Sequence, residues 1–294
     1  MLRHPALCAF MSARSPDPLP DNEYVLGTHD AEIARLEVQH NAWRDDAGAA
    51  WRTAGFTRNH AIVDVGCGPG FATLDLAALV GPEGRIVAID QSRRFLAHLL
   101  RECERRGYGH VHSVETDLTR LSLPRESFDG AWIRWVLAFV ASPRDVLARL
   151  ADALKPDGAV AIHEYFEYGT WRLWPRDADF ERFVAATMAA WRHSGGEPDV
   201  GLAIPTWLEE LGFAVRSVRL ITDSVKPPHP RWEWAMAFAS SGPLRLAELG
   251  DISQDDAARM LQSVHRARAA GAWMITPGVA EIVAVKVATP HRPP

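Results

Sequence analysis

A strand, a glycine-rich turn and a helix follow one another between residues 61 and 80. Residues 61–65 (AIVDV) are apolar except for Asp64, glycines follow at positions 66, 68 and 70, and residues 71–80 have the pattern of a helix. Glycine permits a tight turn and lets a ligand lie against the main chain, and the first helical turn presents free N–H groups. This order predicts an α/β fold with a nucleotide-type site at the turn.

The glycine spacing narrows the class of ligand. A dinucleotide fingerprint, G-x-G-x-x-G, has its third glycine three residues after the second, whereas Gly70 is two residues after Gly68 and Phe71 takes the expected place. The turn also lacks the Lys and Ser/Thr of a phosphate-binding loop. An uncharged or cationic nucleoside therefore fits better than a polyphosphate, and a nicotinamide-dependent oxidoreductase is the alternative.

Strand and helix patterns alternate from residue 61 to residue 165, which predicts a doubly wound, mostly parallel sheet with helices on both faces. Polar residues follow several predicted strands, namely Asp90, Asp117, Arg134 and His163. Ligands of such sheets bind outside the carboxyl ends of the strands. We therefore expect these side chains to meet at one edge.

Each of these residues has a functional and a structural interpretation. Asp90 lies twenty residues after Gly70, where a carboxylate can receive the ribose hydroxyls of a nucleoside. Asp117 could accept a hydrogen bond from an exocyclic amine, or it could simply form a turn. His163 is the candidate general base, or a hydrogen-bonded wall residue.

Composition excludes several other classes. The chain has 294 residues, 47% of them hydrophobic, enough for one large domain or two small ones. A net charge of -5 without a long basic run argues against a nucleic-acid partner, and no apolar run is long enough to cross a bilayer. Three scattered cysteines fit a reducing cytoplasm, and the histidine spacing predicts no metal site. We expect residues 1–20 to form a flexible tail, with Met1 or Met11 as the true start.

Five segments together resemble the class I S-adenosylmethionine-dependent methyltransferases. They are residues 63–70 (VDVGCGPG), Asp90, Asp117-Leu118, Phe128-Asp129 and residues 154–158 (LKPDG). The family usually has a second glycine where this chain has Asp157. The resemblance covers residues 61–165 and implies a seven-stranded, Rossmann-like sheet whose last two strands, over 213–221 and 280–288, are antiparallel.

The resemblance implies S-adenosylmethionine as the cofactor and a small molecule as the methyl acceptor. Asp64 would favour the methionyl amine, and Tyr24 and Gln39 become candidates for the methionine end, because small-molecule members often carry an N-terminal helix over the cofactor. The predicted cofactor-binding residues are Tyr24, Gln39, Asp64, Gly66, Gly68, Gly70, Asp90, Gln91, Asp117, Leu118 and Arg134.

We expect one methyltransferase domain over residues 21–294, with its core in 57–165 and 201–289. Residues 21–56, 166–200 and 230–275 would be lid segments. The last two are rich in aromatic residues, which suggests an apolar or aromatic acceptor methylated on O or N, with C as an alternative, although the rings could equally form the core of the lid. The predicted acceptor-binding residues are His163, Tyr165, Trp171, Trp174 and Trp234. A protein that retains the cofactor without methylating is a further alternative, and we expect a monomer or homodimer without a membrane partner.

Overall fold

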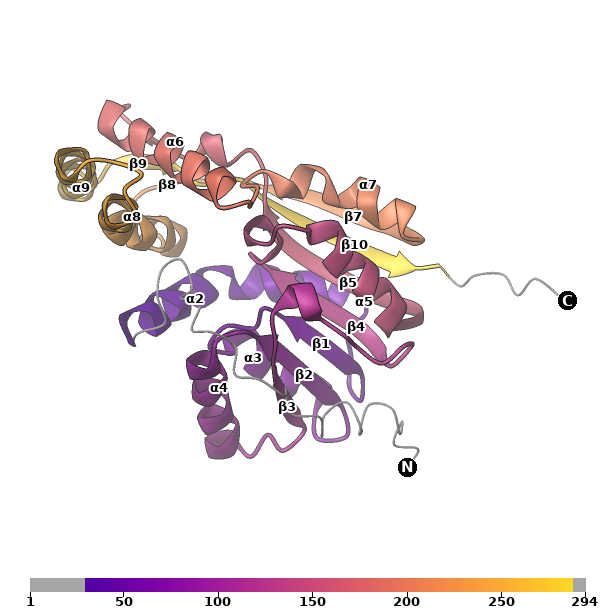
Figure 1. Ribbon diagram of the computed structural model, residues 1–294. Helices are drawn as coiled ribbons and strands as arrows, with labels where there is room; N and C mark the ends of the chain where they lie inside the picture. Colours follow the sequence, from indigo (N-terminus) through magenta and orange to yellow (C-terminus); the bar gives the residue numbers. More distant parts are fainter. Residues whose placement is uncertain (1–29, 288–294) are drawn as a thin grey trace, which may run out of the picture.

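The computed structural model describes residues 30–287, so the predicted tail and the predicted cofactor contact of Tyr24 lie outside the described residues. A seven-stranded sheet in the order β3-β2-β1-β4-β5-β10-β7 forms the centre of the molecule (Figure 1). β10 pairs antiparallel with β5 and with β7, whereas the other pairs are parallel. The predicted fold class is thus confirmed. The strands are β1 (Ala61–Val65), β2 (Arg85–Asp90), β3 (Val111–Glu115), β4 (Phe128–Arg134), β5 (Leu154–Tyr165), β7 (Phe213–Ile221) and β10 (Val279–Lys286).

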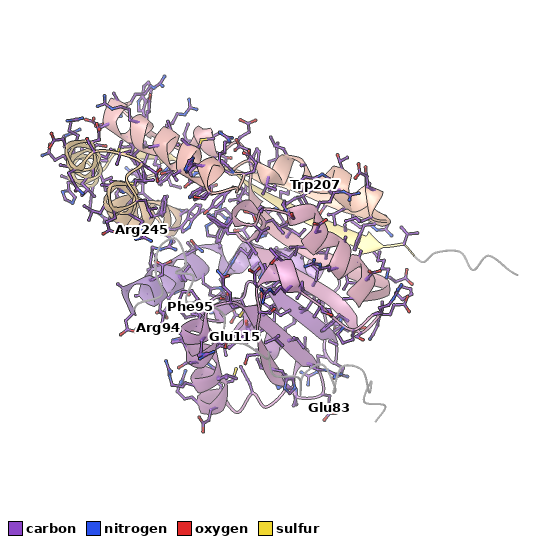
Figure 2. The ribbon with its side chains drawn as sticks, in the orientation of Figure 1. Glu83, Arg94, Phe95, Glu115, Trp207 and Arg245 are labelled. Atoms are coloured by element: carbon purple, nitrogen blue, oxygen red, sulfur yellow. The ribbon has the colours of Figure 1, made fainter. Side chains whose placement is uncertain are left out.

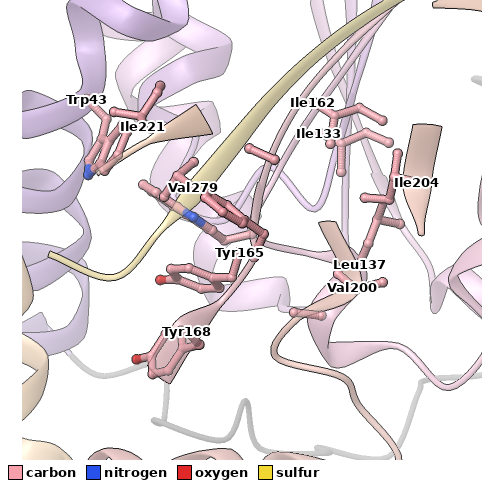
Figure 3. Packing of buried hydrophobic residues seen from close by; sticks show 14 of the residues in the cluster. Trp43, Ile133, Leu137, Ile162, Tyr165, Tyr168, Val200, Ile204, Ile221 and Val279 are labelled. Carbon is pink, nitrogen blue, oxygen red and sulfur yellow. The ribbon is translucent and has the colours of Figure 1, made fainter. Parts of the chain in front are cut away.

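Apolar cores cover both faces of this sheet. Successive strand residues point to opposite faces, so Ile62 belongs to one buried cluster and Val63 and Val65 to the other. The first cluster is completed by α3 (Phe71–Val80), α4 (Arg93–Arg106) and the end of α2 (Asp30–Thr53). The second is completed by α5 (Pro143–Ala153), α7 (Ile204–Glu210) and residues of the lid. Figure 3 shows Tyr165, Tyr168 and Val279 among the residues of this second cluster.

Three helices and a small second sheet lie beside the main sheet, and we use the name lid for these elements. α6 (Ala178–His193), α8 (Pro230–Glu248) and α9 (Gln254–Ala269) pack on one another, and α8 also packs on α2. The second sheet has the order β6-β9-β8, with β6 (Arg172–Trp174), β9 (Trp273–Ile275) and β8 (Ser224–Val225). Figure 1 shows these elements gathered at one side of the main sheet. Strands of two and three residues leave no periodic signal, and the sequence did not predict this sheet. The division into core and lid segments stays a prediction.

The fifth strand is longer than the four residues 159–162 that the sequence predicts. β5 begins at Leu154, and its pairing with β4 shifts register between Phe128 and Gly130. Asp157 adopts a φ of 63° within this turn-like start, the left-handed conformation that glycine adopts without cost. The glycine usual at this place in the family therefore has a conformational reason.

Within residues 30–287, no helix combines the length and the apolar character needed to cross a membrane.

Candidate functional site

A cavity of about 610 Å³ lies where the carboxyl ends of β1, β2, β4 and β5 meet the lid. Its volume falls within the range of about 300–1,000 Å³ that is usual for small-molecule sites. Figure 2 locates two residues that line it, Phe95 on α4 beside the main sheet and Arg245 on the lid helix α8. Polar residues after the strands line one half of the cavity, and aromatic residues line the other.

The glycine turn forms the floor of the polar half. Gly66 and Gly68 line the cavity with φ values of 67° and 55°. A Cβ on Gly66 would come within 2.3 Å of Val136, so the turn packs directly on the loop after β4. Gly70 is not among the lining residues, and a Cβ there would overlap Leu99 of α4. Its predicted role in ligand contact is thus replaced by helix packing.

Four further predicted cofactor residues meet at the same end of the cavity: Asp90, Gln91, Asp117 and Leu118. The Asp90 carboxylate accepts hydrogen bonds from the N–H of Gly68 (2.8 Å) and of Ser92 (2.8 Å). Burial raises the pKa of Asp90, and these N–H groups oppose the rise. Asp117 accepts a bond from the N–H of Thr119 at 2.7 Å and thereby begins a short 3-10 helix, Leu118–Arg120.

Asp64 and Arg134 bring opposite charges to the cavity wall. The Asp64 carboxylate accepts a hydrogen bond from the Thr73 hydroxyl at 2.6 Å, and burial raises its pKa to about 6. Burial also lowers the pKa of the Arg134 guanidinium to about 10, against the attraction of Asp64 and Asp75. Among the described residues Arg134 Nη1 has no hydrogen-bond partner. A desolvated cation without a bonded carboxylate favours an anionic group in the adjoining cavity.

His40 and Asp75 support Arg134 from behind, a pair of residues that the sequence analysis missed. Arg134 Nη2 lies 3.0 Å from His40 Nδ1, and His40 Nε2 lies 3.0 Å from Asp75 Oδ2. Burial lowers the pKa of His40, so we assign the neutral ring, which accepts from Arg134 at Nδ1 and donates to Asp75 at Nε2. Thirty-five residues separate the two side chains, and no local pattern signals their contact.

We expect Asp64→Asn to stabilise the ligand-free protein near neutral pH. Because the pKa of Asp64 in the folded state, about 6, lies above its usual 3.8, its stabilising contribution is complete below pH 3.8 and is lost as the pH rises through 6. Between pH 5 and pH 7.5 the wild type should lose about 1.4 kcal/mol that the asparagine variant keeps. The melting temperature of the variant relative to wild type should thus rise by roughly 3 °C over this interval.

The matched control is Asp152→Asn, because the Asp152 side chain on α5 is 69% exposed. This variant should melt close to wild type near neutral pH. A difference in melting temperature between Asp64→Asn and wild type that did not change with pH would contradict a raised pKa of the buried Asp64 carboxyl.

Stacked aromatic rings form the other half of the cavity. The ring of Trp135 lies 5.7 Å from Tyr165 and 5.5 Å from Trp234, at interplanar angles of 23° and 18°. The Trp234 indole N–H donates to Gln39 Oε1 at 3.1 Å, so Gln39 joins α2 to the lid beside the cavity that it lines. Further aromatic lining residues are Phe139, Tyr168, Trp171, Trp191 and Phe238.

Glu164 fixes the loop that carries Trp135 and Val136. One of its carboxylate oxygens accepts hydrogen bonds from the N–H groups of Val136, Leu137 and Ala138 at 3.0, 2.8 and 3.3 Å. Burial raises the pKa of this carboxyl to about 7, against the effect of these donors. Trp135 itself has a φ of 53°. A non-glycine residue in this region costs free energy, and the bonds to Glu164 hold the loop in place.

His163 and Trp174 do not reach the cavity. His163 is completely buried, its Nε2 lies 3.1 Å from Glu281 Oε2, and burial lowers its pKa. The apolar pattern predicts that this strand ends before His163, but pairing with β10 extends β5 to Tyr165, so His163 lies inside the sheet opposite Glu281. Trp174 is 67% exposed on the outside of the lid. The predicted general-base and acceptor-binding roles therefore have no support from these positions.

Part of the chain is similar in sequence to known methyltransferases. Residues 63–162 match the family model described as "Methyltransferase domain". The demethylmenaquinone methyltransferase of Anoxybacillus flavithermus is 32% identical over 126 residues, 43% of this chain and 52% of that protein. The 2-phytyl-1,4-naphtoquinone methyltransferase of Synechocystis is 27% identical over 152 residues, 51% of this chain and 60% of that protein. The chain thus spans about half the length of these curated relatives.

Solved structures share the fold. The phosphoethanolamine N-methyltransferase 2 of Haemonchus contortus, solved in complex with S-adenosyl-L-methionine, matches with a TM-score of 0.51 and 16% identity. The match covers 84% of this chain and 53% of that chain.

Proposed function

We propose that this chain is a class I S-adenosylmethionine-dependent methyltransferase and that it methylates a small, quinone-type aromatic molecule in its reduced form. The observation that carries the proposal is the single cavity in which a glycine turn with strand-end acids faces a stack of aromatic rings. The relatives whose names specify quinones support the acceptor class.

The polar half of the cavity fits S-adenosylmethionine. Gly66 and Gly68 would lie against the nucleoside, Asp90 would accept its ribose hydroxyls, and Asp117 with Leu118 would hold the adenine. Because the cofactor carries no phosphate, the absence of a basic residue in the turn suits it. When bound, S-adenosylmethionine supplies a methyl group on a sulfonium.

The amino-acid end of the cofactor matches the charges of the wall. The Arg134 guanidinium, which lacks a bonded carboxylate, fits the methionyl carboxylate, and Asp64 fits the ammonium. We retain Gln39 as a contact at this end, in addition to its bond with Trp234.

The aromatic half of the cavity would orient the methyl acceptor. The acceptor would lose its proton by its own ionisation, without a protein base. Within residues 30–287, the carboxylates that line the cavity are Asp64, Asp90 and Asp117, all at the cofactor end, and no histidine lines it. A quinol ring suits such a chamber, because its own ionisation supplies electron density to an oxygen or a ring carbon. That atom would take the methyl group supplied by bound S-adenosylmethionine, which would leave as the neutral thioether S-adenosylhomocysteine, and the methylated quinol would release one proton. The protein contributes alignment and exclusion of bulk water.

We expect Trp234→Ala to lower kcat/KM for the acceptor by about tenfold or more while the affinity for S-adenosylhomocysteine changes less than about twofold. The reason is the loss of its stacking with Trp135, since an aromatic pair contributes about 0.5–1.5 kcal/mol beyond the buried area. Trp234→Phe, which keeps a ring and loses the bond to Gln39, should lie between wild type and alanine. Steady-state kinetics and calorimetry measure the two quantities.

Trp207→Ala is the control, because Trp207 lies on α7, outside the cavity lining (Figure 2). It should leave kcat/KM within about twofold of wild type. A parallel loss of cofactor affinity in Trp234→Ala would count against an acceptor role.

The function itself is tested by incubating the protein with trideuteromethyl-labelled S-adenosylmethionine and reduced 2-alkyl-1,4-naphthoquinones, followed by mass spectrometry. We expect a product that carries one trideuteromethyl group and an equal amount of S-adenosylhomocysteine. Tight binding of S-adenosylhomocysteine without methyl transfer to any reduced quinone, phenol or amine would favour a protein that retains the cofactor without methylating.

A further inference from the structure

An exposed apolar face lies on the outside of the lid. In the small sheet Trp174 of β6 lies opposite Trp273 of β9, and Arg172 lies opposite Ile275. Paired residues and residues two apart in a strand share a face, so these four side chains stand together. Trp174 is 67% exposed, Trp273 46% and Ile275 37%. Exposed large apolar side chains that lie together mark an interaction surface.

The inner face of the same sheet belongs to the core that borders the cavity. Leu173, Val225 and Met274 are buried there. The Trp171 indole N–H donates to the sulfur of Met274 at 3.0 Å, and Trp171 lines the aromatic half of the cavity. The outer face is therefore separated from the acceptor chamber by a thin layer of packed side chains.

Two cations complete the outer face. Lys226 Nζ lies 5.4 Å from the centre of the Trp273 ring, and Arg172 donates to the carbonyl oxygens of Gly169 and Thr170. In the described part of the chain neither forms an ion pair with an acid. Glu181, the acid that experiences the charge of Arg172, is ion-paired with Arg176. We call Arg172, Trp174, Lys226, Trp273 and Ile275 the outer tryptophan face.

We propose that the outer tryptophan face docks on the surface of an anionic lipid bilayer. Tryptophan prefers the membrane–water interface, and Lys and Arg are attracted to anionic headgroups. The outer tryptophan face carries two positive charges, whereas the whole chain has a net charge of -5, so the remainder of the chain is net negative and would be repelled by such a surface, which would orient the lid toward it. This peripheral contact differs from our expectation of no membrane partner, which no observation here overturns, and it involves no spanning helix among residues 30–287.

Membrane docking rests on the proposed function only in its biological purpose. That purpose is to bring the lid close to a quinone-type acceptor dissolved in the membrane. Docking is therefore measured without cofactor or acceptor, by flotation of the protein with vesicles of phosphatidylcholine plus phosphatidylglycerol or of phosphatidylcholine alone. We expect binding to the anionic vesicles that weakens as salt is raised. The double variant Trp174→Ser/Trp273→Ser should reduce the partition coefficient about tenfold or more, and Lys226→Ser should reduce it about fivefold.

Leu220→Ser is the matched control, because Leu220 is 58% exposed on the edge strand β7 of the main sheet. It should bind vesicles as wild type does, and thermal melting should show that all variants are folded. Equal vesicle binding by wild type and the double tryptophan variant, or no binding by wild type at low salt, would overturn the proposal. So would a dimer in sedimentation that depends on Trp174 and Trp273 and persists with vesicles present. Methyl transfer in detergent can succeed or fail independently of these results.

Discussion

Asp90→Ala is expected to weaken binding of S-adenosylhomocysteine by at least about 100-fold. Two ribose hydroxyls would lose a carboxylate acceptor, and a hydrogen bond to a charged group contributes about 1.5–3 kcal/mol. The carboxylate also accepts from the N–H of Gly68, so the glycine turn itself loses a support. Isothermal calorimetry with wild type and variant measures the effect.

Asp90→Asn separates the two contributions, because it keeps one acceptor oxygen and should give an intermediate affinity. Asp152→Asn on α5 serves as a surface carboxylate control and should bind as wild type does. If a folded Asp90→Ala protein bound S-adenosylhomocysteine with unchanged affinity, the ribose would not lie at Asp90. The proposed placement of the cofactor would then be wrong.

Arg134→Met should also weaken S-adenosylhomocysteine binding, by about 10- to 100-fold, because one charge-assisted contact to the methionyl carboxylate is lost. The ligand-free protein should not become less stable in proportion. Replacing a desolvated cation by an apolar side chain of similar length is often neutral or stabilising. Burial already lowers the pKa of this guanidinium, which indicates the desolvation cost that the variant avoids.

The informative result is therefore the divergence between calorimetry and thermal melting for the same variant. Arg134→Lys keeps the charge but lacks the planar fork, and should recover part of the affinity. If Arg134→Met lost stability and affinity together, Arg134 would be a structural residue that holds His40 and Asp75, and the carboxylate would bind elsewhere.

The sequence was most informative where chemistry coincides with a strand end. Asp90 and Arg134 follow apolar runs long enough to be recognised as strands, and parallel topology then brings them to one edge. The same logic failed for His163 because the end of β5 was misplaced by three residues, from 162 to Tyr165. That extension depends on pairing with β10, more than a hundred residues later in the chain.

Contacts between segments far apart in the chain could not be predicted from the sequence. The bond between His40 and Asp75 depends on how α2 packs on α3, and the three N–H donors of Glu164 exist only once the loop after β4 has formed. The tryptophans of the lid illustrate the same point. Trp234 lines the cavity whereas Trp174 is exposed, and nothing in their local sequences distinguishes the two.

A crystal structure with S-adenosylhomocysteine tests the central claim most directly. We predict the ribose at Asp90, the adenine at Asp117, the methionyl carboxylate at Arg134, and the sulfur directed toward Trp135, Tyr165 and Trp234 inside an enclosed aromatic chamber. A sulfur atom that faces an open groove or bulk solvent, or a ligand bound outside this cavity, would contradict the assignment of a small aromatic acceptor to this site.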